Sequence, residues 1–414
     1  MKILLIAIGT RGDVQPFLTL GRALVARGHR VSLAAPQGFT AEAEAAGLDA
    51  HPLPMDFQEL LQKPEMQGAL TSLSGKLKAY RWATDLMNQQ LTAIWELGLA
   101  LEPQLLLHHF KGSLAPWLAE RLGIASIPVM LQPGFTPTGD YPQFLIAARS
   151  LGRWLNRASY ALILPLMRWG TTSMIRRWTR ATGIDPGPKR DPLAGHDPRG
   201  AARRLHAYSP TLFPRDPAWP EAETQTGYLF AEPPDWSPPA DLTAFLEAGD
   251  PPIYVGFGSM PGIDHARTTR AVLGALERTG RRAVIATGWG GIADLDPSPN
   301  FHVLSSVPHA WLFPRVAAVV HHGGSGTTHE GLRWGRPSIV CPLFADQPMF
   351  GQRVFELGAG PRPVRQKALT ADRLAEAIEV ALRPEVAARA ADLGEQIREE
   401  DGLGGTIALV ERYA

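Results

Sequence analysis

Short apolar runs alternate with longer amphipathic stretches along most of the chain. Ile3–Ile8 is an uninterrupted apolar run, Gly9–Asp13 has the composition of a turn, and Val14–Arg27 carries apolar residues at helical spacing. A second strand pattern, Arg30–Ala35, follows directly. Uninterrupted apolar runs of this length are typical of strands covered on both faces of a parallel sheet. The pattern therefore predicts an α/β fold in which helices connect parallel strands.

The same alternation continues through the rest of the chain, and a proline-dense stretch divides it. Further strands are predicted at Gln104–His108, Ser126–Leu131, Thr224–Phe230, Ile253–Phe257, Arg282–Thr287, Phe301–Leu304, Ala317–His321 and Ser338–Pro342. Ala231–Pro239 is rich in proline, which favours a stiff, extended connector. We therefore expect two domains, residues 1–230 and 251–399, joined by a linker at residues 231–250.

A glycine-rich turn follows the predicted strand at Ala317–His321. His322 is followed by Gly323, Gly324 and Gly326, and a helical pattern begins at once. The first backbone N–H groups of a helix have no partner within the helix, and the helix dipole adds positive partial charge there. Such a turn can bind an anion, most often a phosphate. The glycine spacing fits neither a Walker loop nor the dinucleotide-binding fingerprint, and a tight connection without a ligand is the alternative.

Polar residues follow this turn at positions where a nucleotide would be contacted. Glu330 lies inside the new helix, close enough to reach a ribose. Asp346 and Gln347 follow the predicted strand Ser338–Pro342, at the edge where open α/β sheets bind ligands. Since a proline comes next, helix capping is the alternative role for Asp346 and Gln347.

Four stretches of the chain together resemble one enzyme family. They are Gly9–Pro16, Tyr254–Met260, Val307–Pro314 and residues 319–351. The last stretch resembles the donor-binding signature of the family 1 glycosyltransferases, nucleotide-sugar-dependent enzymes with the GT-B fold. Together, the four look most like the branch that contains sterol 3β-glucosyltransferases and antibiotic glycosyltransferases. The resemblance covers both ends of the chain and thins between about residues 55 and 200.

This resemblance implies a two-domain architecture and a different binding role for each domain. In a GT-B protein, two Rossmann-like domains with parallel sheets face each other across a cleft. By this resemblance, residues 1–230 would bind the acceptor and residues 251–399 the nucleotide sugar. A C-terminal helix at about residues 400–414 would cross back and pack on the first domain.

The resemblance also implies roles for single residues in the donor site. His322 would contact the diphosphate together with backbone amides from Ser325 to Thr327. Glu330 would hold the ribose, and Asp346 with Gln347 would bind sugar hydroxyls. Ser259 is expected at the diphosphate, with helix capping as its alternative. The whole expected donor-binding set is Ser259, Val307, His322, Gly324, Ser325, Gly326, Thr327, Glu330, Asp346 and Gln347.

Asp13 is the candidate for the chemical step. An acceptor hydroxyl is a weak nucleophile, so a carboxylate or imidazole within hydrogen-bond reach should take its proton as it attacks the anomeric carbon. Many relatives use a histidine near this loop, whereas this chain has none before His29. Asp13 occupies the Gly-Asp position of the sterol and glycopeptide branches. Its alternative role is a helix N-cap, with Pro16 in the first turn, and His108 and His109 are further candidates for the base.

A basic segment occupies residues 141–184, which contain seven arginines, three tryptophans and no acidic residue. Arg149, Arg153 and Arg157 are spaced by four, which predicts that they share one helix face. Such segments are typical of an interface with an anionic membrane, and a pair of amphipathic helices packed on the first domain is the alternative. A hydrophobic acceptor is expected to dock near this region. The candidate acceptor contacts are Gln132, Phe135 and Trp154.

Composition limits the partners and the compartment. The formal net charge is +1, so no overall charge directs the protein to nucleic acid. The single cysteine, Cys341, excludes an internal disulfide and fits a reducing compartment. Lys2–Ile8 is too short for a signal peptide, and no apolar run approaches the roughly 18 residues that span a bilayer. We expect a cytoplasmic protein, with peripheral contact to the inner membrane face as the alternative that the basic segment leaves open.

No metal or other cofactor is expected beside the nucleotide sugar, which is a co-substrate. Asp294 and Asp296 resemble the metal-binding Asp-x-Asp of a different glycosyltransferase fold, but their surroundings of Gly, Pro and Ser predict a solvated turn. The helix N-terminus and His322 would instead stabilise the departing nucleoside diphosphate electrostatically.

These features favour an inverting glycosyltransferase that moves glucose from UDP-glucose to a hydroxyl of a sterol or related polycyclic lipid. Inversion is implied by the family, since one carboxylate without a second nucleophile gives a single displacement. The nearest alternative is a natural-product enzyme acting on a polyketide, macrolide or other aglycone, or a lipid glycosyltransferase such as a rhamnosyltransferase, with a dTDP- or UDP-linked sugar. A non-catalytic nucleotide-sugar-binding partner is the alternative from another class. The presence of Asp13, His322, Glu330 and Gln347 argues against it.

Overall fold

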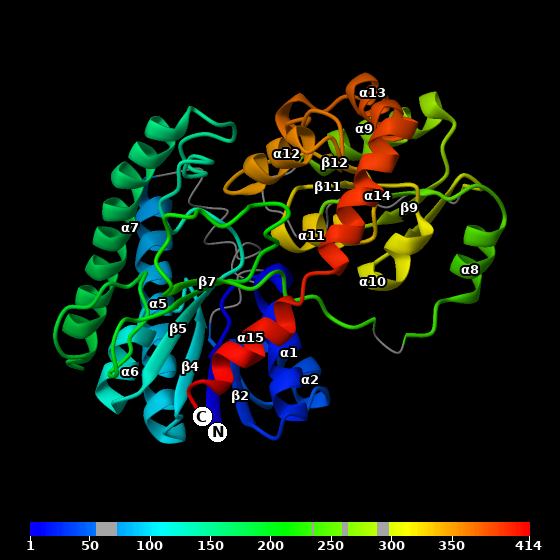
Figure 1. Ribbon diagram of the computed structural model, residues 1–414. Helices are drawn as coiled ribbons and strands as arrows, with labels where there is room; N and C mark the ends of the chain where they lie inside the picture. The colour runs from blue at the N-terminus through cyan, green and yellow to red at the C-terminus, as the bar shows by residue number, and fades with distance from the viewer. Residues whose placement is uncertain (55–72, 234–235, 259–263, 288–297) are drawn as a thin grey trace.

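The computed structural model describes residues 1–54, 73–233, 236–258, 264–287 and 298–414 of the chain. Within these ranges the chain forms two parallel β-sheets surrounded by helices, and the two halves stand side by side (Figure 1). The α/β class predicted from the alternation of apolar and amphipathic stretches is confirmed.

Seven parallel strands form the N-terminal sheet, in the order β3-β2-β1-β4-β5-β6-β7. Their bounds are Lys2–Ile6 (β1), Arg30–Pro36 (β2), Asp49–Leu53 (β3), Leu105–His109 (β4), Ala125–Met130 (β5), Arg204–His206 (β6) and Glu223–Gln225 (β7). The helices of this half are Arg11–Ala26 (α1), Gln37–Phe39 (η1), Thr40–Ala45 (α2), Leu73–Leu101 (α5), Ala115–Leu122 (α6) and Arg153–Thr182 (α7).

Helices cover both faces of this sheet, which explains why its central strands are apolar throughout. Ile3 and Leu5 of β1 belong to the core beneath α1. Leu4 and Ile6 point to the other face, into the core formed with α5, α6 and α7. Gly21 of α1 lets that helix approach the sheet closely, because a Cβ there would lie 2.8 Å from a Leu48 methyl group.

Five parallel strands form the C-terminal sheet, in the order β10-β9-β8-β11-β12. Their bounds are Ile253–Gly256 (β8), Ala283–Ala286 (β9), Phe301–Leu304 (β10), Ala318–His321 (β11) and Ser338–Val340 (β12). The helices of this half are Ala240–Glu247 (α8), His265–Thr279 (α9), His309–Leu312 (α10), Phe313–Arg315 (η2), Ser325–Arg333 (α11), Gln347–Glu356 (α12), Gln366–Ala368 (η3), Ala371–Ala381 (α13) and Pro384–Arg398 (α14).

Each sheet has one place where the order of its strands reverses direction. In the first sheet, β1 lies between β2 and β4, and in the second, β8 lies between β9 and β11. Loops leave the carboxyl ends of the two central strands in opposite directions there, which opens a crevice for a ligand. The fold therefore predicts that the loops after β1, β4, β8 and β11 build the site.

The last helix, Gly402–Glu411 (α15), returns from the second half to the first. Ile407, Leu409 and Val410 belong to the same buried core as Val14 and Phe17 of α1. Figure 1 shows α15 beside α1, whereas the preceding helix α14 lies against α11 of the second half. The chain therefore connects its two halves twice, once after β7 and once between α14 and α15.

Some elements differ from the sequence prediction. Residues 240–247 of the predicted linker form α8, and Leu242 is fully buried among residues of the second half. The predicted strand Thr224–Phe230 is only the three-residue β7, and the short strands β3 and β6 were not predicted. These three strands carry too few consecutive buried apolar residues to give a strand pattern.

The basic segment forms one long helix, so the predicted helix pair is wrong. Helix α7 begins at Arg153, and Gly152 before it has φ +90°, outside the helical range. Arg149 consequently lies in the preceding loop and does not share a helix face with Arg153 and Arg157. Among the described residues, no helix combines the length and the apolar character that crossing a membrane requires.

Candidate functional site

Asp13 lies in the first turn of α1, directly after the carboxyl end of β1. Its Oδ2 accepts a hydrogen bond of 2.8 Å from the Thr10 backbone N–H, and the Lys111 ammonium lies 3.1 Å away. Its Oδ1 lies 3.3 Å from His109 Nε2. Only glycine fits at position 9, since Gly9 has φ +142° and a Cβ there would collide with the Asp13 carboxylate. The strands β1 and β4 are neighbours at the reversal point. Residues at or just after their carboxyl ends therefore contact the same carboxylate.

The charges around Asp13 keep it ionised. Burial alone would raise the pKa of Asp13, but His109, Lys111 and the Thr10 N–H outweigh that effect and hold the pKa below its usual value. Burial lowers the pKa of His109 to about 3 in spite of the neighbouring carboxylate, so the ring is neutral at neutral pH. Lys111 is then the cation that stabilises the carboxylate. The Asp13 side chain is 19% exposed and that of His109 is 0% exposed, so Asp13 is the group that reaches solvent.

The capping alternative for Asp13 is confirmed in part. Thr10 is the N-cap residue of α1, and Asp13, three residues later, accepts the Thr10 backbone N–H in a capping box. His108, a further candidate, is fully buried and its Nδ1 donates to the His109 carbonyl at 3.1 Å. Lys111 was not predicted, although it follows the end of β4 as Asp13 follows the end of β1. That shared position is the signal that would have found it.

On the other side of the site, the chain passes from β11 through a glycine turn into α11. Gly323 has φ +92°, and a Cβ there would lie 2.6 Å from a Val340 methyl group, so the turn needs glycine. Gly324 is the N-cap residue of α11, and the first intrahelical bond runs from Thr328 N–H to the Gly324 carbonyl at 3.0 Å. The amides of Ser325, Gly326 and Thr327 precede that bond and point out of the helix end.

His322 stands beside this helix end. A Cβ on Gly324 would lie 2.5 Å from its Nε2, so the glycine makes room for the ring. Burial lowers the pKa of His322 to about 4, which makes the imidazole neutral. Its buried Nδ1 has no hydrogen-bond partner among the residues that the structure describes. A neutral imidazole here can donate one hydrogen bond to an anion at the helix end.

The acidic and amide groups predicted to bind the sugar and ribose already have some partners. Glu330 Oε1 accepts from Trp334 Nε1 at 2.7 Å, and burial raises its pKa against the opposing effects of Arg333 and Trp334. Gln347 Oε1 accepts from the Leu343 N–H at 2.8 Å, which fixes the loop before α12.

Asp346 occupies the N-cap position of α12 without a side-chain capping bond, so the capping alternative does not describe its side chain. The preceding Ala345 has φ +56°, a conformation that costs a non-glycine residue energy. Burial raises the pKa of Asp346 to about 6, and repulsion from Asp13 contributes. Asp346 and Asp13 therefore lie within electrostatic range, although they belong to different halves of the molecule.

Direct contacts also join the two halves around the helix end. The Ser325 hydroxyl donates a 2.7 Å hydrogen bond to the Leu131 carbonyl, which follows β5. The ring of Tyr228 stacks on His329 of α11 with centroids 4.3 Å apart. The loops after β1, β4, β5, β11 and β12 thus converge on one region between the sheets, where the strand reversal points predict a ligand site.

Four other predicted positions lie in a buried core or outside the described ranges. Val307 is nearly buried in the core around α10. Ser259, Asp294 and Asp296 lie outside the described residues. Among the described residues, no group of three or more histidine, cysteine or acidic side chains is arranged to hold a metal ion. The expectation of a metal-free site stays a prediction.

An aromatic row extends from His109 toward α7. The ring centroids of His109 and Phe110 are 4.4 Å apart, and those of Phe110 and Phe135 are 4.5 Å apart. The ring centroids of Phe135 and Phe144 are 6.2 Å apart, and Phe135 is almost fully buried. Gln132, three residues before Phe135, is half-buried. Phe110 was not among the predicted acceptor contacts. It follows His109 directly and, unlike His109, is only half-buried.

Trp154, the third candidate acceptor contact, lies apart from this row. Its side chain is 78% exposed, and it does not belong to the buried cluster that contains Phe135. Its position at the start of α7 places it on the outer surface of the first half.

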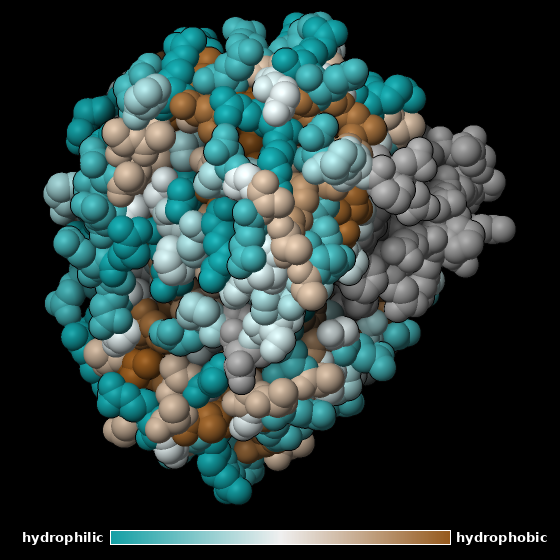
Figure 2. All heavy atoms as spheres, turned by 90° about the vertical axis from the view of Figure 1, so that its right-hand side faces the viewer, coloured by the Kyte–Doolittle hydropathy of each residue, from teal (hydrophilic) through white to brown (hydrophobic). Residues whose placement is uncertain are grey.

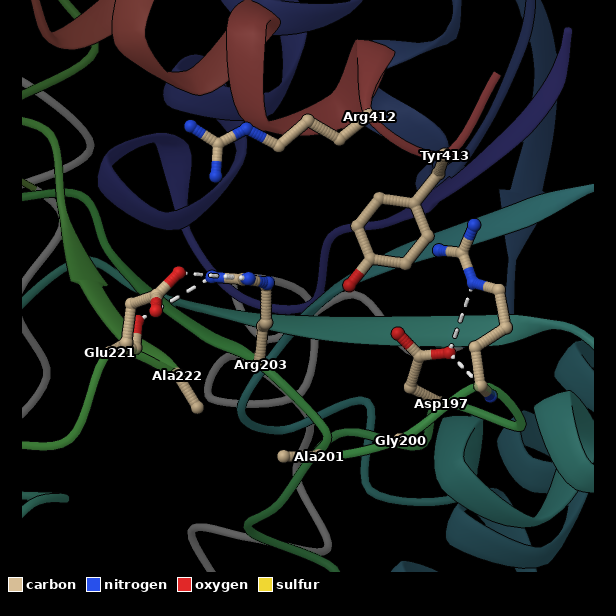
Figure 3. A pocket seen from close by; sticks show the side chains of 9 residues that line it. Asp197, Gly200, Ala201, Arg203, Glu221, Ala222, Arg412 and Tyr413 are labelled. Atoms are coloured by element: carbon tan, nitrogen blue, oxygen red, sulfur yellow. Dashed lines mark hydrogen bonds and ion pairs between the residues drawn. The ribbon is translucent and has the colours of Figure 1, made fainter.

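A separate hollow of about 370 Å³ lies between residues 197–203, 221–222 and the C-terminal residues Arg412 and Tyr413 (Figure 3). Arg199 pairs with Asp197 and Arg203 pairs with Glu221, each at 3.3 Å. This hollow lies at the amino ends of β6 and β7, whereas open α/β sheets bind ligands at the carboxyl ends. It is therefore not the candidate site.

Comparisons with known proteins agree with this arrangement. Residues 3–135 match the glycosyltransferase family 28 N-terminal domain, and residues 272–401 match the erythromycin biosynthesis protein CIII-like C-terminal domain. Among solved structures, the glycotransferase of kitacinnamycin superposes with a TM-score of 0.69 at 23% identity, over 100% of this chain and 98% of that one. The spinosyn rhamnosyltransferase SpnG complexed with thymidine diphosphate gives 0.64 at 21% identity, over 99% and 100%. These structures establish the GT-B fold.

Two named relatives match along the whole chain. The sterol 3-beta-glucosyltransferase UGT80A2 of Arabidopsis thaliana is 34% identical over 98% of this chain, which spans 64% of that relative's length. The O-mycaminosyltylonolide 6-deoxyallosyltransferase of Streptomyces fradiae is 33% identical over 100% of this chain and 98% of its own length. The chain belongs to the GT-B glycosyltransferase family whose members include the sterol 3β-glucosyltransferases and the antibiotic glycosyltransferases, as the resemblance predicted.

Proposed function

We propose that this glycosyltransferase moves glucose from UDP-glucose to a hydroxyl of a hydrophobic acceptor, a sterol or related polycyclic lipid, with inversion at the anomeric carbon. The observation that carries the proposal is the Asp13 carboxylate of α1, which is held by Thr10, His109 and Lys111. Helix α1 contacts α11 of the other half. The first half would offer a base and the second half an anion-binding helix end.

The donor diphosphate would lie at the start of α11. Its oxygens would accept hydrogen bonds from the amides of Ser325, Gly326 and Thr327 and from His322. As the bond to the sugar breaks, negative charge grows on the departing diphosphate, and these fixed donors stabilise it. Asp346 and Gln347 would bind the sugar hydroxyls, and Glu330 would bind the ribose after its bond to Trp334 rearranges.

The acceptor hydroxyl would attack from the side of Asp13. Asp13 is ionised at neutral pH, and it would take the hydroxyl proton as the new C–O bond forms. Neutral His109 would present Nε2–H to the other carboxylate oxygen and fix its orientation. One displacement with no covalent sugar intermediate gives inversion.

Two observations favour an apolar acceptor of some size. The aromatic row His109–Phe110–Phe135–Phe144 begins at the proposed base, and its half-buried members Phe110 and Phe144 offer apolar ring surface. The Arabidopsis relative, by its name, glucosylates a sterol. A rigid polycyclic ring system would bury well against such a surface.

A natural-product acceptor with a deoxysugar donor is the second candidate. The Streptomyces relative matches over 98% of its length, and its name describes transfer of a 6-deoxyallosyl group to a macrolide. The spinosyn enzyme was solved with thymidine diphosphate. Under this alternative the same groups would act on a dTDP-linked sugar.

A matrix of donors and acceptors tests the proposal. UDP-glucose, dTDP-glucose and dTDP-rhamnose are each combined with a sterol, a hydroxy fatty acid and a macrolide aglycone, with and without EDTA, and products are identified by mass and NMR. We expect a β-glucoside of the sterol from UDP-glucose, formed equally well in EDTA. Product only from a dTDP-sugar and an aglycone would favour the second candidate, and UDP binding without any product would favour a non-catalytic partner.

A further inference from the structure

Large apolar side chains that remain exposed gather on one part of the surface. Ten such side chains occur among the described residues, and eight of them lie between residues 145 and 169. They are Leu145, Ile146, Leu151, Trp154, Leu155, Leu162, Leu166 and Trp169. This concentration distinguishes the segment, because scattered single apolar residues are normal on a surface and a contiguous patch is not.

The patch follows one face of α7. Leu155, Leu162, Leu166 and Trp169 are spaced by three, four or seven residues, which places them on a single stripe of the helix. The opposite face is buried in the first half and includes Tyr160, Leu164, Ile175 and Trp178. The inner face therefore packs α7 onto the first half, and the outer stripe takes no part in that packing. In Figure 1, α7 forms the outer edge of the N-terminal half.

The same stripe changes from apolar to basic toward the end of the helix. Arg176, Arg177 and Arg180 continue its spacing beyond Trp169, and all three are exposed. Arg153, Arg157 and Arg168 have ion-pair partners outside the segment, at distances of 3.6, 3.5 and 2.8 Å. Because no acid occurs in residues 141–184, the outer face of α7 has an apolar half and a cationic half.

The opposite side of the molecule looks different. On the face around α8, hydrophilic side chains predominate and apolar ones are scattered among them (Figure 2). The concentration of exposed large apolar side chains beside Arg176, Arg177 and Arg180 therefore distinguishes α7 from the face around α8.

We propose that this face binds the surface of an anionic lipid bilayer, with α7 lying along the interface. Trp169 and the exposed leucines would enter the head-group region, and Arg176, Arg177 and Arg180 would contact lipid phosphates. Anionic lipid complements both halves of the stripe. A second copy of the chain does so less well, since twofold pairing of this face places its arginines against either apolar side chains or other arginines, and residues 141–184 contain no acid to neutralise them.

Vesicle flotation of the full chain tests the proposal. Vesicles of phosphatidylcholine alone are compared with vesicles that contain phosphatidylglycerol as well. Two triple variants are prepared: Leu162→Ser with Leu166→Ser and Trp169→Ser, and Arg176→Gln with Arg177→Gln and Arg180→Gln. The matched control replaces three exposed arginines of the C-terminal half, Arg270, Arg281 and Arg383, by glutamine. Thermal unfolding and UDP binding of every variant report that the fold is intact.

We expect the wild-type chain and the control to float with anionic vesicles and to be released by high salt. Partition should fall at least about tenfold in the apolar variant and about 100-fold in the arginine variant. Failure of the folded wild-type chain to bind anionic vesicles would overturn the proposal. So would vesicle binding that the apolar variant retains, or a wild-type dimer that becomes monomeric in the apolar variant without any vesicle binding.

Discussion

Asp13 combines two properties that a general base needs, a negative charge at working pH and access to solvent. Lys111 supplies the first, because a cation at 3.1 Å stabilises the carboxylate against the cost of burial. The 19% exposure of its side chain supplies the second. The same contacts make the carboxylate a weak base, so it can take the proton only as the attacking oxygen becomes acidic during bond formation.

Asp13→Asn should therefore lower kcat by a factor on the order of 10²–10⁴ while leaving the fold intact. The asparagine oxygen can still accept the Thr10 N–H, but it cannot take a proton. The measurements are turnover, thermal unfolding and UDP affinity. The control is Asp372→Asn, which changes an exposed aspartate in the first turn of α13 in the second half. Near-normal turnover of a folded Asp13→Asn enzyme would assign the proton to another group.

Asp346 predicts a pH dependence of donor binding. Burial raises its pKa from 3.8 to about 6, so it is ionised above about pH 6 and protonated below. The ionised form accepts more hydrogen bonds from sugar hydroxyls, and the affinity for the nucleotide sugar should fall as the pH is lowered through 6. In Asp346→Asn this change should disappear. Calorimetry with the nucleotide sugar at pH 5, 6 and 7.5 tests it, with UDP as the control ligand that lacks the sugar. An identical pH profile in the variant would contradict the role of Asp346.

At the scale of elements, the sequence predicts well what long apolar runs and glycines determine. The strand at 318–321, the glycine turn and the helix from Ser325 follow from an apolar run, three glycines and a helical pattern. Short elements are not predictable in this way, since β6 has only Leu205 and His206 buried and is held by pairing with β5 and β7. The helix pair considered as the alternative for the basic segment is wrong, because α7 runs without a break through Pro165 and Gly170, residues that disfavour a helix interior, while tertiary packing of its inner face keeps it continuous.

Gly324→Ala tests whether the glycine turn positions His322. The backbone at Gly324 has φ −64°, which alanine adopts without strain, but the new Cβ would lie 2.5 Å from His322 Nε2. The ring must move, so donor affinity should fall about tenfold or more while the thermal midpoint changes little. The control is Gly170→Ala, which meets no atom within 4 Å in a helix interior. If UDP binds Gly324→Ala as tightly as the wild type, His322 does not contact the diphosphate from this position.

At the scale of the whole molecule, contacts between the halves depend on residues far apart in the sequence. The Ser209 N–H donates to His329 Nε2 at 3.1 Å, and the Ser209 hydroxyl donates to Glu400 Oε1 at 2.6 Å. Glu400 also accepts from the Thr211 N–H at 3.1 Å. No periodicity or motif predicts these bonds, because each residue taken singly is an ordinary polar residue. They fix α11 and the start of α15 to one loop of the first half.

Glu400→Ala should therefore destabilise the whole molecule more than its partial exposure indicates. It leaves the Ser209 hydroxyl and the Thr211 N–H without their acceptor, a loss of about 1–3 kcal/mol in unfolding free energy. Glu400→Gln keeps an acceptor oxygen and should restore most of that stability. Glu399→Ala, at the exposed neighbouring position, should stay within about 0.5 kcal/mol of the wild type. Denaturant unfolding measures the stability. The increase in stability when UDP is added reports whether the donor site still binds the nucleotide. If Glu400→Ala and Glu399→Ala are equally stable, the bonds to Glu400 do not hold the two halves together. The position of the helix end at Ser325 is then determined by its hydrogen bond to the Leu131 carbonyl and by packing.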